Sequence, residues 1–149
     1  MKHFPTARLR VKVHPADTTA QAREVLRRHE VATKIVKDKS TSKAILRSDV
    51  VMVVSSTTGL EACAAGRPLL LLRLNNERRA FDYAAYGAAL EVRSAGELAP
   101  ALGRILNDDG VRSSLARGRA LLLADALCGR PGAAAQRAAA ALKSLRGLG

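Results

Sequence analysis

The sequence is poor in aromatic side chains and in cysteine. Phe, Trp and Tyr make up 3% of the 149 residues, tryptophan is absent, and the only thiols are Cys63 and Cys128. Two thiols build neither a disulfide framework nor a zinc site, so we expect both to be buried or inert. Few aromatic rings leave few stacking platforms for single-stranded nucleic acid. These shortages argue against a disulfide-stapled protein and against recognition of bases by stacking.

Long apolar runs and a signal-peptide pattern are also missing. Apolar runs such as Leu69–Leu72 are far too short to cross a bilayer. Residues 1–10 contain no apolar run that leads to a small-residue cleavage site. The three histidines are dispersed along the chain and do not predict a metal site. We therefore expect a cytoplasmic protein without a metal, and a peripheral position at the inner face of the membrane stays open.

Acidic residues are scarce relative to basic ones. The chain has 25 Lys and Arg against 13 Asp and Glu, a formal net charge of +12. The excess is concentrated in residues 1–47, which hold 12 basic and 4 acidic residues. Such a surface attracts the phosphates of a nucleotide, a nucleic acid or an anionic membrane, but solvated arginines alone give the same balance. Charge by itself does not choose among these partners.

Segments typical of strands alternate with segments typical of helices. Residues 8–13 alternate polar and apolar side chains up to the turn at His14-Pro15. Val50–Val54 and Leu69–Leu72 are continuously apolar, as strands covered on both faces are, and we take Val50–Val54 as a central strand. A further short strand is expected near Ala89–Val92.

This alternation predicts right-handed crossovers and a parallel sheet. The expected fold class is therefore α/β, a three-layer Rossmann-like parallel sheet with helices on both faces. We expect one domain over residues 1–149, with a C-terminal helical segment from about residue 95.

Polar residues with known capping preferences mark the expected helix ends. Gly66, with Pro68 two residues later, should end the helix that precedes Leu69–Leu72. Ser94 and Glu97 have the spacing of a capping box. The expected caps at the other helix starts are Asp17, Thr18 or Thr19, then Ser40, and then Asp108 or Asp109, with Gly66 as the C-terminal glycine.

Ligands of doubly wound sheets bind beyond the carboxyl ends of the strands, which draws attention to Ser55–Gly59. Hydroxyl groups, backbone N–H groups and a helix dipole at such a turn suit a phosphate. Gly59 allows close approach of a diphosphate, and Glu61 can accept hydrogen bonds from ribose hydroxyls. An ordinary capped helix is the alternative, because neither common phosphate-loop motif is present.

The order of motifs is similar to that of the donor-binding half of GT-B glycosyltransferases. The block Ser55-Ser56-Thr57-Thr58-Gly59-Leu60-Glu61-Ala62, followed by Gly66-Arg67-Pro68 and a strand, resembles the S-G-T-x-x-L-E-A block of lipid-A-disaccharide synthase. It also resembles the S-G-G-x-x-E-E-A block of UDP-N-acetylglucosamine 2-epimerases. Lys12-Val13-His14-Pro15 is similar to the K-x-H-P turn of those epimerases and of capsule and teichoic-acid transferases. Asn76-Glu77-Arg78 resembles the epimerase T-E-R-P segment, and the whole resemblance covers roughly residues 8–107.

The resemblance implies a nucleotide-sugar site. In it, Glu61 would bind the ribose, and His14 would lie near the phosphates or the sugar, with a catalytic role if the reaction is of the epimerase kind. Lys12 is open between a residue near the ligand and a surface lysine, while Asn76 and Glu77 fit a solvated loop better. The diphosphate would be held by Ser55, Ser56, Thr57 and Thr58, and the expected set is completed by Gly59 and Arg73.

Two departures from the related families shape the functional expectation. The double glycine of the epimerases is replaced here by hydroxyl residues, which weakens an epimerase identity. GT-B enzymes carry the acceptor site on an N-terminal domain, and a first strand within about ten residues of the start leaves no room for one. We therefore expect that domain to come from a missing N-terminal half or from a partner subunit.

Three functions follow, in decreasing order of support. The first is the donor-binding domain of a glycosyltransferase for surface polysaccharide or glycolipid, with a nucleotide-sugar substrate, UDP-linked by resemblance, and no other cofactor. The second is a fragment of an epimerase-like enzyme. The third is a basic nucleic-acid-binding module, although no specific nucleic acid is expected. A homodimer stays open, because an apolar face for the absent domain would be exposed.

Overall fold

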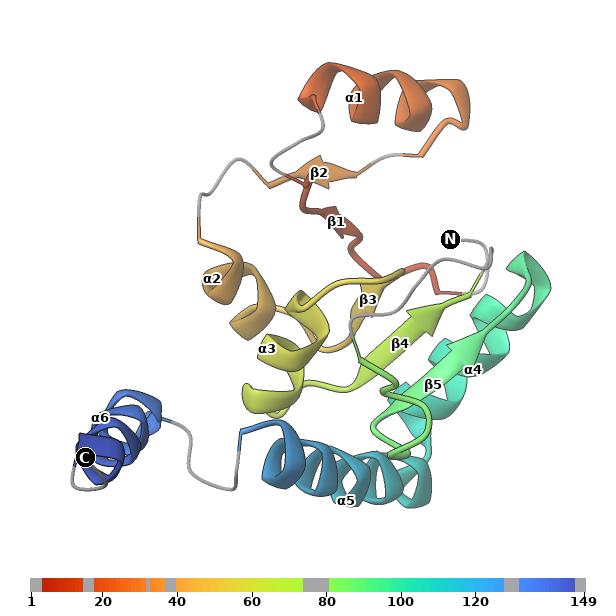
Figure 1. Cartoon of the computed structure of the whole chain (residues 1–149). Helices are drawn as coiled ribbons and strands as arrows, with labels where there is room; N and C mark the ends of the chain where they lie inside the picture. Colours follow the sequence, from red (N-terminus) through yellow and green to blue (C-terminus); the bar gives the residue numbers. More distant parts are fainter. Residues whose placement is uncertain are drawn as a thin grey trace. The chain divides into compact units, whose positions relative to one another are not determined.

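The described part of the chain folds into both strands and helices. The computed structural model describes residues 4–14, 18–31, 33–36, 40–73, 81–127 and 132–146. The chain divides into two compact units, Met1–Asp49 and Val50–Gly149, here called the N-terminal and the C-terminal unit. Each unit contains parallel strands and helices, and strands alternate with helices throughout the N-terminal unit (Figure 1). The fold is mixed α/β, as the sequence predicts.

The N-terminal unit contains a pair of short parallel strands. Its elements are β1 (Arg10–Val11), α1 (Thr19–Arg28), β2 (Lys34–Ile35) and α2 (Thr41–Leu46). The strands pair with Val11 opposite Ile35, and the Thr33 hydroxyl donates to the Leu9 carbonyl at 2.7 Å. Strand β1 is thus much shorter than the one predicted over residues 8–13. Just before it, at Leu9, the backbone carbonyl accepts from a side-chain hydroxyl.

Helix α1 has capping hydrogen bonds at both ends. The Thr18 hydroxyl accepts from the Gln21 N–H at 3.2 Å and the Gln21 side chain accepts from the Thr18 N–H at 3.3 Å, a capping box. At its C-terminus, Glu30 adopts a left-handed φ of 51° while the N–H groups of Glu30 and Val31 donate to carbonyls of the last turn. This is a Schellman ending with a glutamate where glycine is usual. None of the α1 residues is buried.

The C-terminal unit contains a three-stranded parallel sheet in the order β3-β4-β5. Leu71 lies opposite Val53 on one side and Glu91 on the other. β4 is the central strand, so the prediction of a central strand at Val50–Val54 is wrong for this sheet. β3 is an edge strand, and its Met52 is 36% exposed. The elements of the unit are β3 (Val51–Val53), α3 (Thr58–Ala64), β4 (Leu69–Leu72), β5 (Ala89–Val92), α4 (Ala95–Asn107), α5 (Asp109–Ala126) and α6 (Ala134–Arg146).

Helices flank this sheet, in agreement with a Rossmann-like α/β fold. α3 packs against β3 and β4, α4 packs against β5, and α5 contacts α3, α4 and β5 (Figure 1). Because side chains alternate along a strand, Leu70 and Val92 point to one face and Leu69 and Leu71 to the other. All four are at most 1% exposed. Both faces of the central strand are therefore covered, as its continuously apolar sequence predicts.

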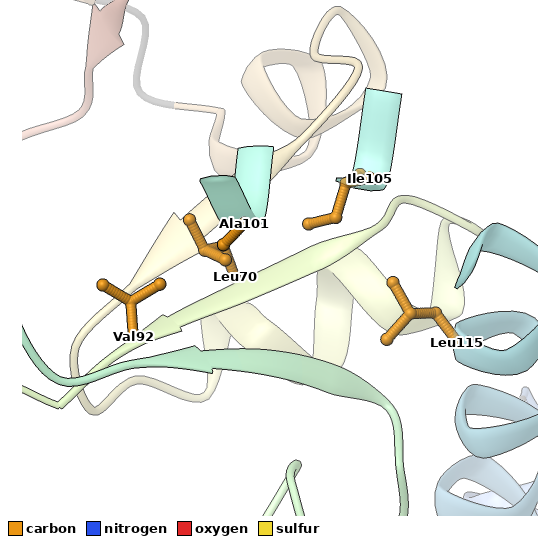
Figure 2. Close-up of a cluster of buried hydrophobic side chains, with 5 residues drawn as sticks. All are labelled: Leu70, Val92, Ala101, Ile105 and Leu115. Carbon is orange, nitrogen blue, oxygen red and sulfur yellow. The ribbon is translucent and has the colours of Figure 1, made fainter. Parts of the chain in front are cut away.

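A cluster of buried hydrophobic side chains lies between the sheet and α4. Leu70 and Val92 pack there with Ala101 and Ile105 of α4 and with Leu115 of α5 (Figure 2). Side chains of this kind each contribute roughly 1.5–3 kcal/mol when taken out of water. This cluster fixes α4 and α5 on the sheet and so holds the strand ends where a ligand would bind.

Most predicted caps are present, with one exception. Ser40 and Asp108 accept the expected backbone N–H groups at the starts of α2 and α5. Gly66 has a φ of 70° and closes a Schellman motif at the end of α3. The capping box at Ser94 is wrong: the Ser94 hydroxyl donates to the Glu97 carboxylate instead of accepting a backbone N–H. The Glu97 carboxylate also accepts the backbone N–H of Arg93, just before the start of α4.

Candidate functional site

The hydroxyl-rich loop and Arg73, which the sequence selects in the C-terminal unit, follow strands that end at the same edge of the sheet. β3, β4 and β5 are parallel, so their carboxyl ends lie at the same edge. β3 runs into the hydroxyl-rich loop 55–58, β4 runs into Arg73, and β5 runs into Arg93. We call these three strand ends the carboxyl edge. Ligands of parallel α/β sheets bind in this position.

Ser56 organises the hydroxyl-rich loop. Its hydroxyl accepts from the Thr58 N–H at 3.1 Å, and its carbonyl accepts from the Gly59 N–H at 3.1 Å. Two of the N–H groups expected to face a phosphate are therefore engaged within the loop. Helix α3 also spans only seven residues, which leaves little macrodipole. Side-chain hydroxyls are the donors that this loop offers to a ligand, and Thr57 is exposed.

A charged cluster occupies the next two strand ends. The Arg73 guanidinium donates to Glu91 Oε1 at 2.6 Å, and the Arg93 Nε donates to the same oxygen at 3.0 Å. The Glu91 side chain is 15% exposed and the Arg73 side chain 30%. One carboxylate thus orients two guanidiniums, and the group keeps one net positive charge. The Arg93 side chain is 71% exposed and so accessible to a ligand, and guanidiniums are well suited to phosphate oxygens.

Gly59 meets a tyrosine in the structure. The Tyr83 side chain is 1% exposed, and its hydroxyl donates to the Ser56 carbonyl at 2.8 Å. A Cβ atom on Gly59 would lie 2.7 Å from Tyr83 Cζ. The close approach of Tyr83 is by itself a physical reason for glycine at this position. A direct contact between Gly59 and a diphosphate stays a prediction.

The remaining candidates lie at separate places in the chain. Glu61 is exposed in the first turn of α3, where its carboxylate is accessible to a ligand. His14 belongs to the N-terminal unit, is exposed, and follows β1 by three residues. Lys12, on the same stretch, is also exposed. Asn76 and Glu77 lie outside the described residues, as do Asp17 and Cys128.

Cys63 is buried on α3, as expected, and so is the nearby phenol. Burial raises the pKa of the Cys63 thiol to about 11, against a smaller lowering effect of Arg119. Burial, with a smaller effect of Cys63, also raises the pKa of the Tyr83 hydroxyl. Both groups are neutral at physiological pH. Tyr83 therefore acts as a hydrogen-bond donor beside the loop, and Cys63 is a poor nucleophile.

Within the described part of the chain, no cluster of His, Cys, Asp or Glu has the makings of a metal site. In the same part, no helix is both long and apolar enough to span a membrane.

Three residues at the carboxyl edge were missed by sequence reasoning. Tyr83 contacts the loop and Glu91 contacts Arg73 only because the fold brings them there, and Arg93 contacts Glu91 on the same strand end. Glu91 carries a weak signal, since it is a charged residue inside an otherwise apolar predicted strand. No local pattern indicates the contact of Tyr83 with Ser56, which is 27 residues away in sequence.

Comparison with known proteins adds one finding. No curated protein and no solved structure matches the chain. Residues 1–74 match the family model described as "Capsule polysaccharide biosynthesis protein". The matched segment includes the turn after β1, the hydroxyl-rich loop, α3 and β4. It covers just under half of the chain, and it supports an involvement of this protein in surface polysaccharide synthesis.

Proposed function

We propose that this chain binds a nucleotide-sugar at the carboxyl edge of the β3-β4-β5 sheet and contributes the donor site of a glycosyltransferase for surface polysaccharide. The observation that carries the proposal is that the hydroxyl-rich loop, Arg73 and Arg93 follow three neighbouring parallel strands at one sheet edge, where Glu91 binds both arginines. The capsule-synthesis match, which includes this loop, supports the same class of function.

The proposed chemistry is stabilisation of a leaving diphosphate. In sugar transfer, the acceptor oxygen bonds to the anomeric carbon while the bond from that carbon to the diphosphate breaks, and the acceptor proton passes to a base. Negative charge then grows on the diphosphate. Loop hydroxyls and the two guanidiniums oriented by Glu91 would stabilise that charge without reorganising.

The other parts of the reaction are assigned by resemblance. Glu61 would accept hydrogen bonds from the ribose, and His14 would contact the phosphates or the sugar. In the enzymes that this chain resembles, the acceptor site lies on an N-terminal domain. We therefore propose that transfer requires such a domain or a partner subunit. The chain alone would bind donor but turn it over at a negligible rate, and an ordinary enzymatic rate for the purified chain would contradict this.

Calorimetric titration tests the donor site. UDP, CDP, GDP and UDP-N-acetylglucosamine are titrated into the wild-type chain at moderate salt, and one nucleotide is expected to bind selectively. Arg73→Ala and Arg93→Ala should each weaken binding by about tenfold, the usual loss of a charge-assisted hydrogen bond. Arg117→Ala, which removes an exposed arginine from α5, is the matched control. An equal effect of all three variants would mean that general positive charge, not this site, binds the nucleotide.

A ligand change tests Glu61 separately. If Glu61 accepts from a ribose hydroxyl, Glu61→Ala and the 2′-deoxy form of the bound nucleotide should lose a similar factor in affinity. Combined, the two changes should lose little more than either alone, because they remove the same interaction. Fully additive losses would exclude this role for the Glu61 carboxylate.

Affinity for nonspecific DNA separates the nucleic-acid alternative. Binding of DNA that falls steeply with salt, together with no selectivity among nucleotides, would favour a basic nucleic-acid module. An epimerase-like activity would instead release UDP with an altered hexosamine.

A further inference from the structure

The start of α3 is held by Ser56 and not by its N-cap residue. The N-cap residue of α3 is Thr57, and its side chain makes no capping hydrogen bond. Its φ and ψ of −61° and −17° are helical instead of extended. The local hydrogen bonds of the loop are made by Ser56, whose hydroxyl accepts the Thr58 N–H and whose carbonyl accepts the Gly59 N–H, so whatever fixes Ser56 also fixes the loop.

Tyr83 makes two contacts with this segment. Its hydroxyl donates to the Ser56 carbonyl at 2.8 Å, which is the carbonyl that also accepts the Gly59 N–H. The end of its ring lies against the bare Cα of Gly59, where an added Cβ would be 2.7 Å from Cζ and 2.8 Å from the hydroxyl oxygen. The phenol thus contacts Ser56 in the loop and Gly59 directly after it.

The Tyr83 ring is itself held in place. It is 1% exposed, and its centroid lies 5.9 Å from that of Phe81. Tyr83 also accepts the Ala88 N–H on its backbone carbonyl at 2.9 Å, which ties it to the start of β5. A rigid donor on a neighbouring strand connection can fix a peptide group more firmly than the loop can by itself.

We infer that Tyr83 is a positioning residue that holds the Ser56 peptide, and with it the loop hydroxyls, in the conformation that binds phosphate. The inference rests on the proposed donor site. Its physical basis is preorganisation: a loop already held in its bound conformation loses less conformational entropy when a ligand binds. No contact of Tyr83 with the ligand is required, so Tyr83 is not assigned a catalytic role.

Hydrogen exchange tests the first step without any ligand. Tyr83→Phe removes the hydroxyl and keeps the ring. Tyr86→Phe is a matched control, because Tyr86 lies in the same turn and its hydroxyl donates to the Asp125 carboxylate instead. In Tyr83→Phe, the amides of residues 57–60 should exchange about fivefold faster, the factor expected for loss of one neutral hydrogen bond. Unchanged exchange in that segment, relative to Tyr86→Phe, would overturn the inference.

Nucleotide affinity tests the second step. At a temperature well below unfolding, Tyr83→Phe should weaken binding of the selected nucleotide by about fivefold while Tyr86→Phe leaves it unchanged. A purely structural role predicts a lower melting temperature and an unchanged affinity of the folded protein, which would overturn the inference. If the wild type binds no nucleotide, the proposed function fails, and the exchange experiment still decides whether Tyr83 fixes the loop.

A pair of substitutions tests the ring contact. Gly59→Ala should loosen the same amides, because its methyl group meets the Tyr83 ring. Tyr83→Leu removes the atoms that clash, so Gly59→Ala should have a smaller effect on exchange and on stability in that background. Equal effects of Gly59→Ala in both backgrounds would show that the ring does not constrain the loop.

Discussion

The chain contains two strand-helix-strand segments, β1-α1-β2 and β3-α3-β4, which share a topology but differ in what holds them. Both pairs of strands are parallel, and both helices end in a Schellman motif with a left-handed residue. α1 has a full capping box but no buried residue. The N-cap residue of α3, Thr57, makes no capping bond, yet Gly59, Ala62 and Cys63 are all buried.

This difference separates local from tertiary stabilisation. Hydrogen bonds at helix ends contribute about 1 kcal/mol each, whereas a buried aliphatic side chain contributes more. α1 illustrates the first kind and the surroundings of α3 the second. The candidate donor site lies in the segment that depends on burial, which fits the need of a binding loop for a rigid support.

The largest expected effect concerns the apolar cluster. Leu70→Ala, at a side chain with 0% exposure, should lower the free energy of unfolding by about 3 kcal/mol. Val25→Ala on α1, where the side chain is 54% exposed, should change it by less than about 0.5 kcal/mol. Urea denaturation of both variants provides the measurement. Similar losses would mean that α1 is buried in solution and that the contrast is wrong.

The left-handed residues after the two helices should respond in opposite directions. Gly66→Ala places a Cβ in a left-handed conformation and should destabilise by about 1 kcal/mol, although open space surrounds the position. Glu30→Gly removes the same strain and should stabilise by up to about 1 kcal/mol. Thermal unfolding measures both, and a destabilised Glu30→Gly would indicate that the glutamate side chain makes a compensating interaction.

The two helix starts should differ in their response to loss of a hydroxyl. Thr18→Ala removes a capping oxygen and should destabilise α1 locally by about 1 kcal/mol, seen as faster exchange of the Gln21 amide. Thr57→Ala removes no capping bond and should change exchange in α3 by no more than about twofold. A large effect at Thr57 would reveal a structural role that its exposed side chain does not suggest.

The smallest expected effect is that of ionisation of the buried Cys63 thiol on α3, which changes stability only above neutral pH. An unfolded thiol ionises from its ordinary pKa of 9.0, whereas the folded Cys63 ionises only near its pKa of about 11. Stability from Cys63 is therefore complete below pH 9 and is lost as the pH rises to about 11. Urea midpoints measured from pH 8 to 11 should fall less steeply for Cys63→Ala than for wild type. Parallel curves would contradict the raised pKa.

Sequence reasoning succeeded where structure depends on neighbours along the chain. The strands at Leu69–Leu72 and Ala89–Val92, the caps at Ser40 and Asp108, and the glycine at position 66 all lie where predicted. Apolar runs and capping residues act over a few positions, so their effect can be read locally. The Ser94 prediction was wrong because Glu97 captured the serine hydroxyl, a competition that spacing alone does not resolve.

The candidate site could be predicted only in part for the same reason. The hydroxyl-rich loop is a local feature and was found directly. The partner of Arg73 depends on the register that places Glu91 on the neighbouring strand. Glycine at position 59 is required by the Tyr83 ring, which comes from a turn far away in the sequence. Contacts between remote segments are set by packing, which a single sequence does not display.

The contact between Gly59 and Tyr83 has a consequence for how this protein can diverge. A single step to alanine at position 59 is blocked while the phenol stays, and loss of the phenol first leaves the loop unsupported. Evolution would then favour paired replacement over either change alone. Among related sequences, positions 59 and 83 should covary, with a bulkier residue at the first accompanied by a smaller one at the second.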